Sequence, residues 1–132
     1  MDFLRATRIL STIFIAMGLA AIAMPAAVAD LFGFDIQQAS GLGFGEIGAL
    51  YGGVFIGLGL IGLYGSREQL DEGPMLIASV GVIWLCIAAG RMLVMLTRPQ
   101  VAWTWFGLVS FGVEATVGAV FLLGARAGSK GL

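Results

Sequence analysis

The chain has 132 residues, of which 59% are hydrophobic and only 11% are charged. Soluble domains carry about 25% charged residues, and disordered chains combine low hydrophobicity with high net charge, so both classes are excluded. The formal net charge of −1 offers no concentrated basic surface for nucleic acid. The composition therefore predicts a small integral membrane protein.

Apolar runs, each long enough to cross the hydrocarbon core as a helix, follow one another along the chain. They cover residues 9–29, 47–66, 75–97 and 101–125. Hydrocarbon requires every backbone amide to be paired within its segment, and the alternating pattern of a membrane barrel is absent, so we expect four α-helices. The whole chain, 1–132, is then one all-α domain: a four-helix transmembrane bundle, up-down-up-down, with its termini on the same side.

The first run also has features of a cleavable signal peptide. Arg5 and Arg8 precede it, and small residues follow Pro25 before Asp30. Its apolar part is longer than the usual signal-peptide core of about 7–15 residues and suffices to span a bilayer. We therefore favour a retained helix, and cleavage is the alternative.

Basic residues are concentrated on the side that would hold both termini. The opposite side carries only Arg98 outside the apolar runs. By the positive-inside rule, this asymmetry predicts cytoplasmic termini in a bacterial inner membrane. The basic residues on the terminal side are Arg5, Arg8, Arg67, Arg126 and Lys130.

The second run is rich in glycine. In water each interior glycine would cost a helix about 1 kcal/mol relative to alanine. In lipid, however, small residues let helices approach closely. Gly48-x-x-x-Gly52 and Gly53-x-x-x-Gly57 place two strips of bare backbone on this helix. We expect these glycines to pack within the bundle, and docking of a second copy or of another membrane protein is the alternative.

Arg91 and Glu114 are the charges inside apolar runs. At the helix rise of about 1.5 Å per residue, Arg91 lies ~9 Å and Glu114 ~18 Å below the far surface. Helical side chains lean toward their own N-terminus, so on antiparallel neighbours these two lean toward each other. We expect an ion pair within a polar cluster in the far-side half of the bundle. Its predicted members are Glu46, Tyr51, Arg91, Ser110 and Glu114, with Ser110 bridging the gap to Glu114.

Two interpretations of this cluster stand side by side. The ion pair can fix the register of the helices, a well-attested use of buried polar groups. Alternatively, Arg91 binds an anionic headgroup or carboxylate, or Glu114 relays protons, because intramembrane ionisable residues often serve function.

The residues for most catalytic chemistry are missing. The chain has no histidine, and Cys86 is its single cysteine, so an intramolecular disulfide or a thiolate zinc site is excluded. We expect no metal, no cofactor and no enzymatic activity. The favoured function is an accessory subunit or a bundle that binds lipid or a membrane partner. The alternative is a small proton-coupled transporter using Glu114, and a membrane enzyme ranks last.

Short motifs spread over nearly the whole chain resemble one family. They are Pro25, Glu46, Tyr51-Gly52-Gly53, Gly57, Gly59, Gly90-Arg91 and Glu114. The chain is similar to small bacterial four-helix membrane proteins catalogued as a domain of unknown function, loosely DoxX-like. The resemblance implies a fold and no established activity. It also implies an arginine near position 48, where this chain has Gly48, so the polar cluster lacks one charge.

Overall fold

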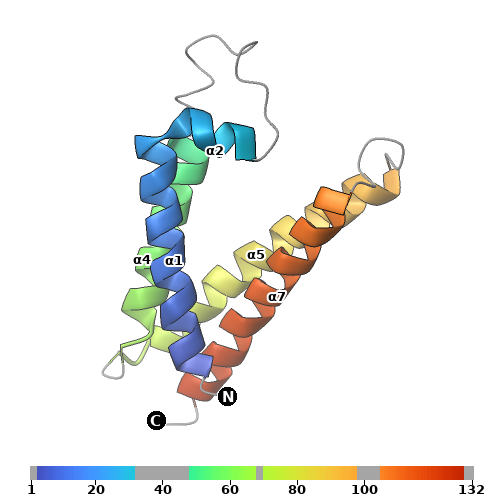
Figure 1. Ribbon diagram of the computed structural model, residues 1–132. Coiled ribbons are helices and arrows are strands. Elements are labelled where there is room, and N and C mark those ends of the chain that lie inside the picture. Colours follow the sequence, from blue (N-terminus) through green and yellow to red (C-terminus); the bar gives the residue numbers. More distant parts are fainter. Residues whose placement is uncertain (1–2, 32–47, 68–69, 98–104, 130–132) are drawn as a thin grey trace.

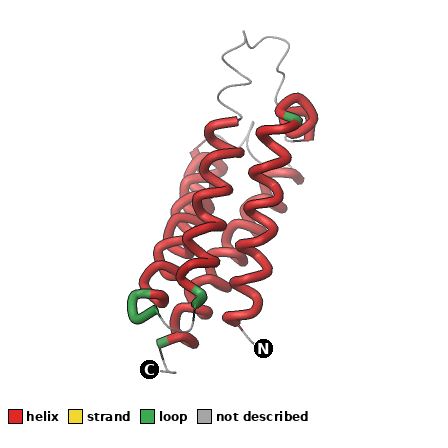
Figure 2. Tube along the Cα trace, turned by 90° about the vertical axis from the view of Figure 1, so that its left-hand side faces the viewer, coloured by secondary structure: helices red, strands yellow, loops and turns green. Residues whose placement is uncertain are grey.

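The computed structural model describes residues 3–31, 48–67, 70–97 and 105–129. Within these ranges the chain is helical, as Figure 2 shows, so the predicted all-α class is confirmed for them. The elements are α1 (Phe3–Ala23), α2 (Pro25–Leu31), the π-helical turn η2 (Gly48–Gly53), α4 (Val54–Gly65), α5 (Gly73–Thr97) and α7 (Trp105–Gly128).

Three of the helices, α1, α5 and α7, are long and apolar enough to cross a membrane, with mean hydropathies between 1.8 and 2.0. The fourth apolar segment is shorter, an uninterrupted helix over Leu50–Gly65 that joins η2 to α4. Length and composition thus support a membrane-spanning protein.

The predicted helix 9–29 differs from the observed structure at both ends. α1 begins at Phe3, ends at Ala23, and is followed by the separate helix α2. The break falls at Pro25, which has no backbone N–H and whose ring clashes with the carbonyl of a continuing helix. Hydrogen bonds from Met24 N to Ala20 O and from Val28 N to Met24 O keep the chain helical up to the break and beyond it.

The predicted helix 47–66 also differs, because its first part is the π-helical turn η2. A π-turn is wider than an α-helix and is rare outside short stretches. Glycine is a poor α-helix former, and η2 contains Gly48, Gly52 and Gly53. The later helices agree better with expectation: α5 begins two residues before the predicted 75–97 and ends at the predicted residue, and α7 ends three residues beyond the predicted 101–125.

The helices associate as two antiparallel pairs, α1 with α4 and α5 with α7 (Figure 1). The pairs meet where α1 begins and α7 ends, and they diverge toward the other end of the molecule (Figure 1). Glycines permit the close contact at the shared end. A methyl group on Gly65 of α4 would lie 2.9 Å from the carbonyl oxygen of Gly73 at the start of α5.

Aromatic rings join the two pairs in the core. Phe14 of α1 stacks on Trp84 of α5 with ring centroids 4.9 Å apart, and on Phe121 of α7 with centroids 6.0 Å apart. Phe121 is fully buried. Contacts between one ring and partners on both α5 and α7 hold the pairs together above their shared end.

Glycines also form the contact between α1 and α4, though at different positions from those predicted. Gly52 faces α1, where a methyl group would lie 3.3 Å from the carbonyl oxygen of Gly18. Gly48, Gly53 and Gly57 meet no neighbouring atom within 4 Å in the described part of the chain, so the expected packing at these three positions does not occur there. Gly59 of α4 approaches α1 closely instead, because a methyl group there would lie 2.6 Å from the carbonyl oxygen of Ser11.

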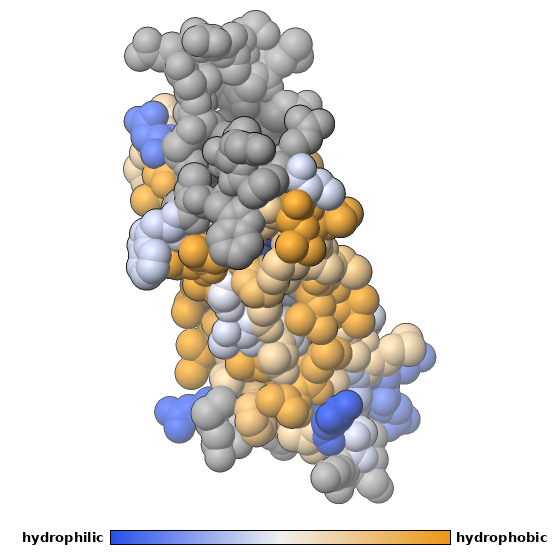
Figure 3. Space-filling view, turned by 90° about the vertical axis from the view of Figure 1, so that its right-hand side faces the viewer, coloured by the Kyte–Doolittle hydropathy of each residue, from blue (hydrophilic) through white to orange (hydrophobic). Residues whose placement is uncertain are grey.

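The surface of the molecule is largely apolar. On the side that carries α5 and α7, hydrophobic residues occupy the middle and hydrophilic ones lie toward both ends, more of them at the end with the termini of α1 and α7 (Figure 3). Exposed side chains on α5 include Val82, Leu93 and Leu96. Soluble monomers rarely expose apolar surface on this scale, so the distribution fits a protein surrounded by lipid.

Replacing Gly59 with alanine should destabilise the protein. The added methyl group would lie 2.6 Å from the carbonyl oxygen of Ser11, a backbone atom that cannot move aside easily. Overpacking of this kind costs about 1–3 kcal/mol. Gly57→Ala is the matched control, because nothing lies within 4 Å of its added methyl group. Thermal unfolding in mild detergent, followed by circular dichroism, should show a lower midpoint for Gly59→Ala alone, and equal midpoints would contradict the packing.

Candidate functional site

Arg91 of α5 and Glu114 of α7 form a two-pronged ion pair. Arg91 Nε donates to Glu114 Oε2 at 2.9 Å, and Nη2 donates to Oε1 at 2.6 Å. Paired parallel hydrogen bonds of this kind fix both distance and orientation. The ion pair expected from the depths and directions of the two side chains is therefore confirmed.

Antiparallel packing of α5 against α7 brings the two residues together. Gly81 and Gly118 let the helices approach, since a methyl group on either would lie 3.0 Å from the carbonyl oxygen of the other. The close approach brings the two backbones within reach of each other's side chains. The carboxylate and the guanidinium therefore meet directly, without a bridging group.

The two partners differ in exposure. The Glu114 side chain is 9% exposed, whereas the Arg91 side chain is 35% exposed. Glu114 uses both carboxylate oxygens for Arg91. The guanidinium carries further N–H groups, and within the described residues these have no acceptor. The exposed edge of Arg91 can therefore donate hydrogen bonds to a molecule that is not part of this chain.

Tyr51 is the other predicted cluster residue that the structure places near the ion pair. It belongs to η2 and lies within electrostatic range of both Arg91 and Glu114. Its ring meets Phe55 edge to face, with centroids 6.0 Å apart. Residues of η2, α5 and α7 thus lie within electrostatic range of one another.

Ser110, another predicted member, does not join this arrangement. Ser110 is half-buried on α7, and no hydrogen bond links it to Glu114. The reason is that Arg91 reaches both carboxylate oxygens itself, so no gap is left for a hydroxyl to bridge. Glu46 lies outside the described residues.

Sequence inspection missed Trp84. Its side chain is buried among Phe14 and Phe55, and its Nε1–H has no hydrogen-bond acceptor in the described structure. A buried indole N–H normally has a partner, so an unpaired one requires an explanation. Trp84, Ala88 and Arg91 recur at helical spacing on one face of α5, and this periodicity could have indicated that Trp84 belongs with the ion pair.

Comparisons with known proteins give this chain no relative: no family model, no curated protein and no solved structure matches it. The resemblance based on Tyr51-Gly52-Gly53 and Gly90-Arg91 therefore stays a prediction. Within the ranges that the structure covers, no group of three or more histidine, cysteine or acidic residues could hold a metal ion. The site must be interpreted from its own geometry.

The ion pair should contribute to stability through direct coupling of its members. Arg91→Ala and Glu114→Ala each leave the other charge without its partner, so each single change should lower the free energy of unfolding. The double variant should lose less free energy of unfolding than the two single variants lose together. The difference is the coupling energy, about 0.5–3 kcal/mol for groups in contact. Denaturant titration of the four proteins of this cycle in detergent measures the coupling. Additive losses would contradict the ion pair.

Proposed function

We propose that the chain is a non-catalytic four-span membrane protein that binds a lipid at the donor groups of Arg91 and Trp84. The observation that carries the proposal is the combination of two unused donors with apolar walls: Trp84 Nε1–H has no acceptor, and Arg91 keeps N–H groups beyond those that serve Glu114. Unpaired donors in an apolar setting are unfavourable until an acceptor arrives.

The charges define the kind of acceptor. Glu114 already neutralises Arg91 through two hydrogen bonds, so the site has donors to offer but little net charge. A group with partial negative charge, such as the ester carbonyl of a lipid, fits this better than a free anion. Tyr51 and Phe55, both half-buried, supply ring surfaces for the apolar part of the same molecule.

An accessory subunit of a larger membrane complex is the closest variant of this proposal. In that case the acceptor is a carbonyl group of another protein's membrane segment rather than a lipid ester. Both versions of the proposal use the same site. The purified protein retains a lipid in the first version and a membrane-protein partner in the second.

Four crossings of a bacterial inner membrane, up-down-up-down with cytoplasmic termini, are part of the proposal. Support comes from the three long apolar helices and from the antiparallel pairing of α4 with α1. The helix over Leu50–Gly65 is short for a span. Local thinning of the bilayer accommodates such a mismatch at modest cost.

The transporter alternative has weaker support. Proton coupling through Glu114 would require the carboxylate to exchange its partner during each cycle. Both of its oxygens accept hydrogen bonds from Arg91, at 2.9 Å and 2.6 Å. Protonation would break at least one of these charge-assisted bonds, which are about twice as strong as neutral ones.

Removing the indole donor should weaken lipid retention. Trp84→Phe keeps an aromatic ring but loses the N–H, and one net hydrogen bond of about 0.5–1.5 kcal/mol corresponds to roughly two- to tenfold in affinity. Trp105→Phe is the matched control, since Trp105 is 81% exposed at the start of α7. Mass spectrometry of solvent extracts measures lipid per mole of protein after purification in mild detergent. Equal retention by the wild type and Trp84→Phe would refute the site.

Neutralising Glu114 separates binding from transport. We expect vesicles that contain the wild type or Glu114→Gln to show the same low proton flux under an imposed pH gradient, measured with an entrapped pH-sensitive dye. Empty vesicles set the baseline. A flux that is present in the wild type and lost in Glu114→Gln would establish the transporter alternative.

A further inference from the structure

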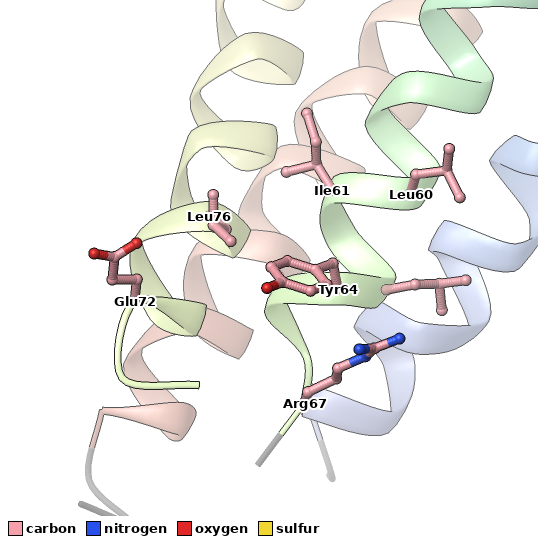
Figure 4. A pocket seen from close by; sticks show the side chains of 7 residues that line it. Leu60, Ile61, Tyr64, Arg67, Glu72 and Leu76 are labelled. Atoms are coloured by element: carbon pink, nitrogen blue, oxygen red, sulfur yellow. The ribbon is translucent and has the colours of Figure 1, made fainter. Parts of the chain in front are cut away.

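A groove of about 670 Å³ lies between α4 and α5, beside the connection that joins them (Figure 4). It is separate from the site around Arg91: none of its lining residues belongs to the ion pair or to the rings beside it. Its size falls within the range of about 300–1,000 Å³ that is typical of small-molecule sites. Its lining includes Leu60, Ile61, Tyr64, Arg67, Glu72 and Leu76.

Both walls of the groove change from apolar to charged in the same direction. On the α4 wall, Leu60 and Ile61 are followed one turn later by Tyr64 and then by Arg67. On the α5 wall, Leu76 lies one turn beyond Glu72. One turn advances about 5.4 Å along a helix. The groove thus has an apolar interior and a charged mouth, which matches the profile from acyl chain to headgroup in one lipid leaflet.

The turn between the helices holds the two charged residues on opposite sides of the mouth. Arg67 N donates to Tyr64 O at 3.2 Å, Leu70 N to Arg67 O at 3.3 Å, and Gly73 N to Leu70 O at 2.9 Å. Leu76 N then donates to the carbonyl of Glu72 at 3.1 Å, which ties Glu72 to the first turn of α5. These bonds fix the backbone from which each charged side chain extends.

Arg67 and Glu72 do not pair with each other in the described structure. The guanidinium of Arg67 lies over the ring of Tyr64 instead, 5.1 Å from its centroid, and Figure 4 shows Tyr64 between the two charges. Stacking on an aromatic ring leaves the N–H groups at the edge of the guanidinium available to an anion. The mouth therefore presents a cation on one wall and an anion on the other.

We propose that this groove binds a zwitterionic aminophospholipid such as phosphatidylethanolamine. Arg67 takes the phosphate, Glu72 takes the primary ammonium, and one acyl chain lies along Leu60, Ile61 and Leu76. The charge pattern selects the headgroup. Phosphatidylglycerol has no cation for Glu72, and the quaternary ammonium of phosphatidylcholine cannot donate a hydrogen bond to a carboxylate.

Native mass spectrometry of the delipidated protein in mild detergent tests the proposal. The protein is titrated separately with phosphatidylethanolamine, phosphatidylcholine and phosphatidylglycerol that carry identical acyl chains. We expect one saturable lipid adduct, with phosphatidylethanolamine favoured up to about fivefold, the range for contacts with exposed ion pairs. Equal affinities, or tighter binding of phosphatidylglycerol, would overturn the proposal without any variant being needed.

Two variants with matched controls assign the contacts. Glu72→Gln should abolish the preference for phosphatidylethanolamine over phosphatidylcholine, whereas Asp71→Asn, an exposed neighbour outside the groove lining, should retain it. Arg67→Gln should weaken the binding of all three lipids. Arg126→Gln, a change at the same end of the molecule on α7, should leave their binding unchanged. A preference that survives Glu72→Gln would overturn the assignment. Because these residues are remote in sequence from Trp84 and Arg91, failure here leaves the Trp84→Phe test untouched.

Discussion

A charge in hydrocarbon must be neutralised, and the ion pair between Arg91 and Glu114 meets this requirement where α5 and α7 cross the apolar region. Its two hydrogen bonds require a specific register between the helices, and the close approach at Gly81 and Gly118 makes that register attainable. The pairing of α5 with α7 therefore depends both on the ion pair, which sets the register, and on the glycines, which let the helices pack closely. Neither would suffice alone, since glycines set no register and a wide helix spacing would separate the charges.

Physical reasoning from the sequence recovers those features that depend on a single strong rule. The long apolar runs gave the approximate positions of α1, α5 and α7, because hydrocarbon tolerates few alternatives to helix. The ion pair followed from depth and side-chain direction, both fixed by helix geometry. These predictions needed no knowledge of how the helices pack.

Features that arise from competition between rules could not be predicted in the same way. The length of the first apolar run favoured one helix, yet the clash at Pro25 divides it. Gly48 is spaced from Gly52 as Gly53 is from Gly57, yet of these four glycines only Gly52 contacts α1 in the described structure, because the contact face depends on the rotation of the helix. Trp84 counted as an apolar residue in the sequence, and its unpaired N–H becomes visible only in three dimensions.

The divergence of the two helix pairs has a mechanical consequence. The two pairs touch through their backbones at the shared end, where Gly65 of α4 meets Gly73 of α5. Above this end they touch through the stacked rings of Phe14, Trp84 and Phe121. Rings slide over one another more easily than interlocked backbones separate. Hinge motion about the shared end, where Gly65 meets Gly73, would therefore change the spacing between the pairs least at that end, more at Trp84 and most at the wide end (Figure 1).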